Sequence, residues 1–113
     1  MCMKIRKEDL IRINQGFDGH LRSDSSLDFA FDRIDNKRFG EYKKLAYLWR
    51  AILVDHPFTD GNKRTAMFLA FSFANENDNQ ADDKLLAHSI VSIAKKNITN
   101  IRQIEERLRN AIR

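Results

Sequence analysis

Apolar residues recur at helical spacing along almost the whole chain. In the segment 41–55, for example, Leu45, Leu48 and Ile52 fall on one face of a helix that turns once every 3.6 residues. No segment alternates apolar and polar residues as a half-buried strand does. The pattern predicts six helices, at residues 7–15, 25–34, 41–55, 62–74, 82–93 and 99–112.

Local signals indicate where several of these helices begin and end. Pro57 disfavours helical backbone at the preceding residue, so we expect the third helix to end near His56. Ser25 and Asp28 have the spacing of a capping box, which predicts that they begin the second helix. Gly16 is expected to close the first.

The helix predicted at 62–74 has almost no polar side, because its apolar residues surround the axis: Ala66, Phe68, Leu69, Ala70, Phe71 and Phe73. We therefore expect an all-α fold, a bundle of about six helices around this buried central helix. Trp49 and the eight Phe residues are interpreted as core.

Length and composition narrow the class of protein. A chain of 113 residues has room for one domain, here spanning 1–113, and its four Gly and one Pro suit long helices with short loops. Cys2 is the only cysteine and cannot form an internal disulfide. Without an apolar leader or a run long enough to cross a bilayer, we expect a cytoplasmic protein that does not contact membranes.

The net charge of +4 arises from basic residues mixed with acidic ones. Such mixing is typical of solvated helix faces and argues against nucleic acid as a partner.

The candidate chemistry lies between the third and fourth helices, where residues 56–65 read HPFTDGNKRT. A helix N-terminus carries unpaired N–H groups and a partial positive charge, so it binds anions. Gly61 permits a tight turn and the close approach of a phosphate. Lys63 and Arg64 are placed unfavourably for the helix dipole unless an anion occupies the site. The segment therefore predicts a phosphate-binding site.

Two further side chains in this segment could complete a reactive site. The carboxylate of Asp60 is a suitable ligand for Mg²⁺ beside a phosphate, and His56 could accept a proton. Each residue also has an ordinary structural interpretation. His56 could be a helix C-cap, Asp60 with Gly61 a turn, and Asn62 an N-cap. The functional interpretation depends on their occurrence together within ten residues.

The pattern His-Pro-Phe-x-Asp-Gly-Asn-Lys-Arg-Thr resembles the signature of the Fic/Doc family, and its Asn-Lys-Arg-Thr part resembles the Doc (death-on-curing) branch. Weaker similarity covers residues 8–14 and 27–40. The resemblance implies a Fic/Doc-like bundle that uses Mg²⁺ and ATP or another nucleoside triphosphate to modify a hydroxyl group of a target protein.

The resemblance also implies a role for each residue of the loop. His56 would be the catalytic base, Asp60 would hold Mg²⁺, and Phe58 would anchor the loop in the core. The anion hole that binds the phosphates would comprise Gly61, Asn62, Lys63 and Arg64. The connector before the third helix falls where the family carries a flap that docks the target, which here would comprise Asn36, Lys37, Arg38 and Phe39.

Two positions separate the chemistries within the family. Fic enzymes that transfer AMP typically carry Gly where this chain has Lys63, and a second Arg where it has Met67. These departures favour a Doc-like kinase that transfers the terminal phosphate, whose known class of target is a translation elongation factor. Pro57 and Gly61, however, resemble the Fic pattern, so Fic-type adenylyl transfer (AMPylation) remains the alternative. The inhibitory motif Ser/Thr-x-x-x-Glu-Gly/Asn is absent, which fits a toxin restrained by a separate antitoxin but also an unregulated enzyme.

Functions outside the transferases fit the sequence less well. A nucleic-acid-binding helical domain would need a basic stripe, which the scattered acidic residues interrupt. A degenerate family member that only binds nucleotide or a partner protein is a further alternative, against which the presence of four residues argues: His56, Asp60, Asn62 and Arg64. His20 and His88 are interpreted as surface or packing residues, since the histidines lack the paired spacing of a metal hydrolase.

Overall fold

A computed structural model describes residues 5–113 and contains helices α1 Lys7–Gln15, α2 Ser25–Ile34, α3 Glu41–Asp55, α4 Asn62–Glu76, α5 Asp83–Lys96 and α6 Ile101–Ala111. The all-α prediction is confirmed, and within this part of the chain extended pairing is limited to isolated bridges. None of the described helices is long and apolar enough to cross a membrane. Cys2 lies outside the described residues.

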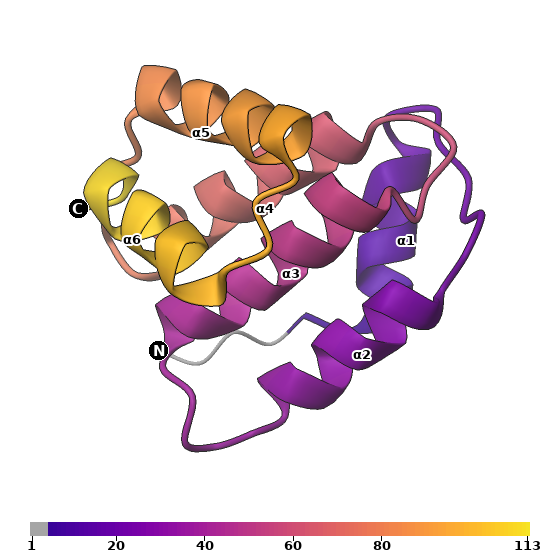
Figure 1. The fold of residues 1–113 in the computed structure, drawn as a ribbon, viewed down its shortest axis with the longest axis horizontal. Coiled ribbons are helices and arrows are strands. Elements are labelled where there is room, and N and C mark those ends of the chain that lie inside the picture. The colour runs from indigo at the N-terminus through magenta and orange to yellow at the C-terminus, as the bar shows by residue number, and fades with distance from the viewer. Residues whose placement is uncertain (1–4) are drawn as a thin grey trace.

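The central helix of the bundle is α3, not α4 as the sequence predicted. α3 packs against α2, α4, α5 and α6, and it runs through the middle of the fold in Figure 1. Seven of its fifteen residues are buried. In α4, by contrast, the side chains of Phe68 and Phe71 are 43% and 39% exposed. An apolar residue on every side of a helix therefore does not bury every side when neighbouring helices cover only part of it.

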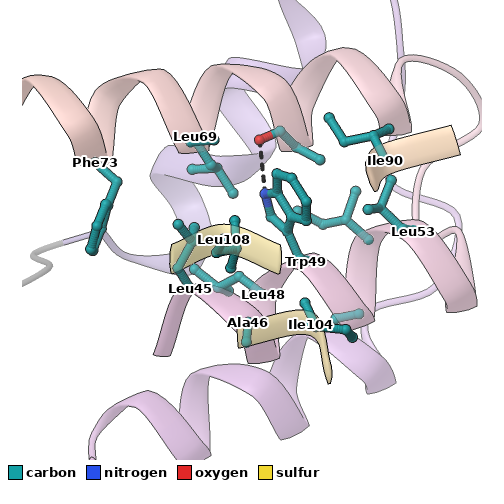
Figure 2. Packing of buried hydrophobic residues seen from close by; sticks show 14 of the residues in the cluster. Leu45, Ala46, Leu48, Trp49, Leu53, Leu69, Phe73, Ile90, Ile104 and Leu108 are labelled. Carbon is teal, nitrogen blue, oxygen red and sulfur yellow. Dashed lines mark hydrogen bonds between the residues drawn. The ribbon is translucent and has the colours of Figure 1, made fainter. Parts of the chain in front are cut away.

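Trp49 links the two helices that carry the candidate chemistry. Its indole is fully buried among leucines and isoleucines from four helices (Figure 2), and its Nε1–H donates a hydrogen bond of 3.0 Å to the carbonyl oxygen of Ala66 in α4. A buried indole N–H needs such a partner. The contact fixes the middle of α3 relative to the first half of α4. The expectation that every Phe belongs to the core is wrong for Phe29, Phe68 and Phe71, which are exposed.

The acidic residues at the start of α2 form ion pairs with α1 and do not form the predicted capping box. Ser25 is the first residue of α2, and Asp24 precedes it as the N-cap residue, so the capping box predicted at Ser25 and Asp28 does not form. Instead, the Lys7 ammonium donates to Asp28 at 2.7 Å and to Asp24 at 3.1 Å. These hydrogen bonds raise the pKa of Lys7, Asp28 contributing most, and the bond from Lys7 lowers the pKa of Asp24.

Candidate active site

The segment 56–61 that joins α3 to α4 lies beside the loop 16–24 that joins α1 to α2, and the two loops are seen together at the right of Figure 1. Backbone hydrogen bonds connect them. The Thr59 N–H donates to the carbonyl of His20 at 2.8 Å, and the Arg22 N–H donates to the carbonyl of Pro57 at 2.7 Å. The two loops therefore form one surface at this end of the bundle.

His56 follows the last residue of α3 and has left-handed backbone, with φ 49° and ψ 64°. The helix thus ends where Pro57 predicts, and His56 takes the C-cap position. A left-handed conformation is unfavourable for a residue other than glycine, so it needs support from its surroundings. Part of that support comes from Arg22, whose guanidinium donates to the His56 carbonyl at 2.6 Å. The imidazole is half-buried in this position.

Phe58 lies in the hydrophobic core with 1% of its surface exposed, as the loop-anchor prediction requires. The side chain of Asn62 holds this anchor from the start of α4. Its Oδ1 accepts from the Phe58 N–H at 3.3 Å, and its Nδ2 donates to the Phe58 carbonyl at 3.0 Å. Asn62 is consequently not the N-cap residue that its type suggested, since that position belongs to Gly61.

Asp60 and Gly61 form the turn in front of α4. Gly61 has φ 72°, a value that glycine adopts without the steric penalty of other residues. Its N–H donates to Oδ1 of Asp60 at 2.7 Å, which orients the carboxylate. Asp60 is exposed, and its second carboxylate oxygen has no hydrogen-bond partner among residues 5–113. This oxygen is available to a metal ion.

A cavity of about 380 Å³ opens at this turn. Its lining includes all six residues predicted to be the base, the metal ligand and the phosphate-binding residues, namely His56, Asp60, Gly61, Asn62, Lys63 and Arg64. Phe17 and Asp18, from the neighbouring loop, complete its lining together with Thr59. Lys63 and Arg64 are exposed in the first turn of α4, which has no acidic residue. The cavity thus combines a positive helix end with two cations, one imidazole and two carboxylates.

The predicted flap is not part of this cavity. Asn36, Lys37, Arg38 and Phe39 lie before α3, at the opposite end of that helix from His56, and none of them lines the cavity. They form a turn in which the Arg38 N–H donates to Oδ1 of Asn36 at 2.9 Å. The Phe39 ring stacks on Tyr47 of α3, with centroids 5.6 Å apart. Target docking by this segment stays a prediction.

Sequence reasoning missed four residues around the site: Asn14, Phe17, Asp18 and Arg22. Asn14 had a usable signal, because a polar residue four positions after Leu10 falls on the apolar face of α1. The residue is fully buried. Arg22 had none, since an exposed arginine in a polar loop gives no hint that its guanidinium reaches the carbonyl of His56.

A family model, that of the Fic/DOC family, matches residues 4–74. The match covers more than half of the chain and includes both loops that form the cavity. The chain belongs to the Fic/DOC family. Members of the Fic/DOC family are in general nucleotide-dependent transferases that modify proteins, and they generally use Mg²⁺ with a nucleoside triphosphate. Comparison of the chain with curated proteins and with solved structures gave no match.

Family membership agrees with the arrangement of charge in the cavity. A protein-modifying Fic/DOC enzyme has to bind a polyanion and remove a proton from a hydroxyl group, and the cavity has cations for the first task and an imidazole for the second. The Fic/DOC match ends at residue 74, within α4, so α5 and α6 follow the matched segment.

Proposed function

We propose that the chain is a Doc-like protein kinase that acts in the cytoplasm. It transfers the terminal phosphate of ATP, or of another nucleoside triphosphate, to a Ser or Thr hydroxyl of a target protein, for which a translation elongation factor is our first candidate. One observation carries the proposal: the cavity holds His56, Asp60 and the N-terminal end of α4 within a single space of about 380 Å³.

The start of α4 suits the binding of nucleotide phosphates. The N–H groups of the first helical turn have no partners within the helix and point out of its positive end. Lys63 and Arg64 add two full charges in the same turn. Gly61, with its left-handed backbone, forms the turn in which these N–H groups begin. A triphosphate would supply the anion that this concentration of positive charge lacks.

The donor chemistry of the cavity fits Mg²⁺ shared with a substrate. No group of three or more His, Cys, Asp or Glu residues within 5–113 could hold a metal ion by itself. Mg²⁺ at phosphoryl-transfer sites is typically bound through one or two carboxylates together with substrate phosphates, and Asp60 offers such a carboxylate oxygen. When bound, the ion would neutralise charge on the phosphate oxygens.

His56 supplies the base in this scheme. Its imidazole accepts the proton of the target hydroxyl while that oxygen forms a bond to the terminal phosphorus. The bond from this phosphorus to its bridging oxygen breaks, and a nucleoside diphosphate leaves. Arg22 supports His56 by binding its carbonyl, and Phe58 keeps the loop attached to the core. Water could accept the phosphoryl group in place of the target hydroxyl. Binding of the target at the cavity favours the hydroxyl by holding it in position.

Two residues of α4 favour phosphoryl transfer over AMP transfer. Lys63 places a charged side chain at the cavity, where an adenylylating enzyme typically has the open space of glycine. Met67 is partly buried against the core, so this position provides packing rather than a second arginine clamp on the phosphates.

The alternative function remains Fic-type AMPylation, which Pro57 and Gly61 favour. An antitoxin protein that covers the cavity is the proposed regulatory partner.

Transfer from labelled nucleotides tests the proposal. Purified protein, Mg²⁺ and an elongation factor, or a whole lysate in parallel, are incubated with ATP labelled on either the α- or the γ-phosphate. We expect label on protein from the γ-phosphate only. Label from the α-phosphate only would replace the kinase by the AMPylation alternative. Absence of protein label in every reaction, with a correctly folded enzyme, would contradict a transferase function.

A further inference from the structure

Asn14 reaches the candidate site from within the core. The residue lies on α1 and is fully buried. Its Nδ2 donates one hydrogen bond of 2.8 Å to the carbonyl of Asp60 and a second of 3.1 Å to Oγ1 of Thr65, in the first turns of α4. One amide group therefore connects three elements: helix α1, the turn that carries the candidate metal ligand, and the N-terminal end of α4.

The side chain is poorly suited to a purely stabilising role. Its Oδ1 is buried and has no hydrogen-bond partner within residues 5–113. An unsatisfied buried polar atom is costly, and an apolar residue of the same size would avoid that cost. Asn14 also lies on the face of α1 that carries Leu10, where an aliphatic residue would pack. A residue that lowers stability at such a position is expected where function requires it.

Two glycines leave the space that this amide occupies. A Cβ atom on Gly61 would lie 3.1 Å from Nδ2 of Asn14, and one on Gly19 would overlap both the Asn14 side chain and the Asp60 carbonyl. Both loops of the site therefore pass directly against Asn14. The amide is packed on two sides by backbone, so it cannot shift without moving the turn at Asp60.

We propose that Asn14 is a positioning residue that sets the geometry of the phosphate and Mg²⁺ site. The inference rests on the proposed function and deepens it. By holding the Asp60 carbonyl, Asn14 fixes the peptide that leads into Gly61, and with it the direction of the Asp60 carboxylate and of the first N–H groups of α4. Asn14 does not line the cavity, so it acts through Asp60 and not by contact with the nucleotide.

Three variants separate positioning from stability. Asn14→Leu removes the donor and fills the same space. The double variant Asn14→Leu with Thr65→Val also removes the hydroxyl that would otherwise lose its partner, and replacing both members of a buried polar pair by apolar groups is close to neutral for stability. Leu10→Ala is the matched control, because Leu10 is a fully buried neighbour on the same helix that makes no hydrogen bond to the loop.

Three measurements are made on each variant. Thermal unfolding gives Tm. Amide hydrogen exchange of Gly61 and Thr65, whose N–H groups donate to Oδ1 of Asp60 and to the Gly61 carbonyl, reports the order of the turn without any ligand. Calorimetric titration gives Kd for ATP with Mg²⁺ and for inorganic triphosphate with Mg²⁺. Asn14→Leu alone leaves the Thr65 hydroxyl and the Asp60 carbonyl unpaired, so we expect its Tm to fall by about 5 °C, whereas the double variant should melt closer to the wild type. For both Asn14 variants we expect exchange at Gly61 and Thr65 faster by about tenfold and both Kd values raised by about tenfold, as loss of one buried hydrogen bond predicts. Leu10→Ala should lower Tm by about 10 °C or more and leave Kd unchanged.

Unchanged exchange and unchanged Kd in both Asn14 variants would overturn the proposal. So would unfolding of both, or losses of binding that merely follow the loss of Tm as in Leu10→Ala, because Asn14 would then be a stability residue. A wild-type protein that binds neither ATP nor inorganic triphosphate would contradict the proposed function instead. In that case hydrogen exchange would still show whether Asn14 orders the turn.

Discussion

Replacement of Gly61 by alanine tests the turn on which the phosphate site depends. Gly61 has φ 72° and ψ 13°, and this left-handed backbone costs about 1–2 kcal/mol for a residue with a Cβ atom. The added Cβ would also lie 3.0 Å from Cβ of Phe17 and 3.1 Å from its carbonyl oxygen. We therefore expect Gly61→Ala to lower the free energy of unfolding by about 2 kcal/mol. For a chain of 113 residues that corresponds to a fall in Tm of about 8 °C.

The assay is urea unfolding followed by the fluorescence of Trp49, the single and fully buried tryptophan. Gly40→Ala is the matched control, because Gly40 has φ −70° and an added Cβ would meet nothing within 4 Å. The control should change stability by less than about 1 kcal/mol. Equal stability of the two variants would refute the reasoning, since Gly61 would then not need its left-handed conformation.

Three further substitutions have expected outcomes. Phe58→Ala empties a buried site and should destabilise the protein by about 3–5 kcal/mol in urea unfolding while weakening ATP binding; wild-type binding would show that the loop needs no anchor. Trp49→Phe leaves the Ala66 carbonyl without its donor and should cost about 1–3 kcal/mol, measured by urea unfolding followed by far-ultraviolet circular dichroism because this variant has no tryptophan; no loss would mean that the hydrogen bond is unimportant. Lys7→Met should lower Tm slightly at neutral pH. Because Lys7 lowers the pKa of Asp24 in the folded state, this contribution is present above the ordinary carboxyl pKa and is lost as pH falls through the lowered value, so melting curves of the two proteins should converge once the pH lies below the lowered pKa of Asp24. A difference that persisted in acid would assign the effect to packing.

Helical periodicity and a few local signals were enough to predict the six helices, because every helix carries buried or partly buried apolar residues at helical spacing and polar or glycine-containing turns separate the segments. Pro57 ends α3 at the expected place, and Asn100 caps α6 with Oδ1 accepting from the Gln103 N–H at 3.1 Å. The prediction that α4 is central was wrong because periodicity reports which sides of a helix are apolar, not how many neighbours cover them. Phe68 and Phe71 show the difference.

The residues of the cavity could be predicted because they are contiguous in sequence and meet at one helix end. The residues that hold this segment in place could not be predicted, because they come from distant parts of the sequence. Asn14 binds the Asp60 carbonyl across 46 positions of the chain, and Arg22 binds the His56 carbonyl across 34. Such contacts depend on the packing of α1 against α4, which periodicity does not specify. The cap predicted at Ser25 failed for a similar reason, since Lys7 of α1 takes the carboxylate of Asp28.

The most direct test of the account is the role of His56. Transfer of the γ-phosphate to protein and binding of ATP with Mg²⁺ are measured in parallel for the wild type, for His56→Ala and for His88→Ala, whose histidine is exposed on α5 away from the cavity. We predict that His56→Ala slows transfer by about 100- to 10,000-fold with Kd nearly unchanged, and that His88→Ala matches the wild type. Transfer that survives in His56→Ala, or transfer and binding that disappear together, would contradict a general base at His56.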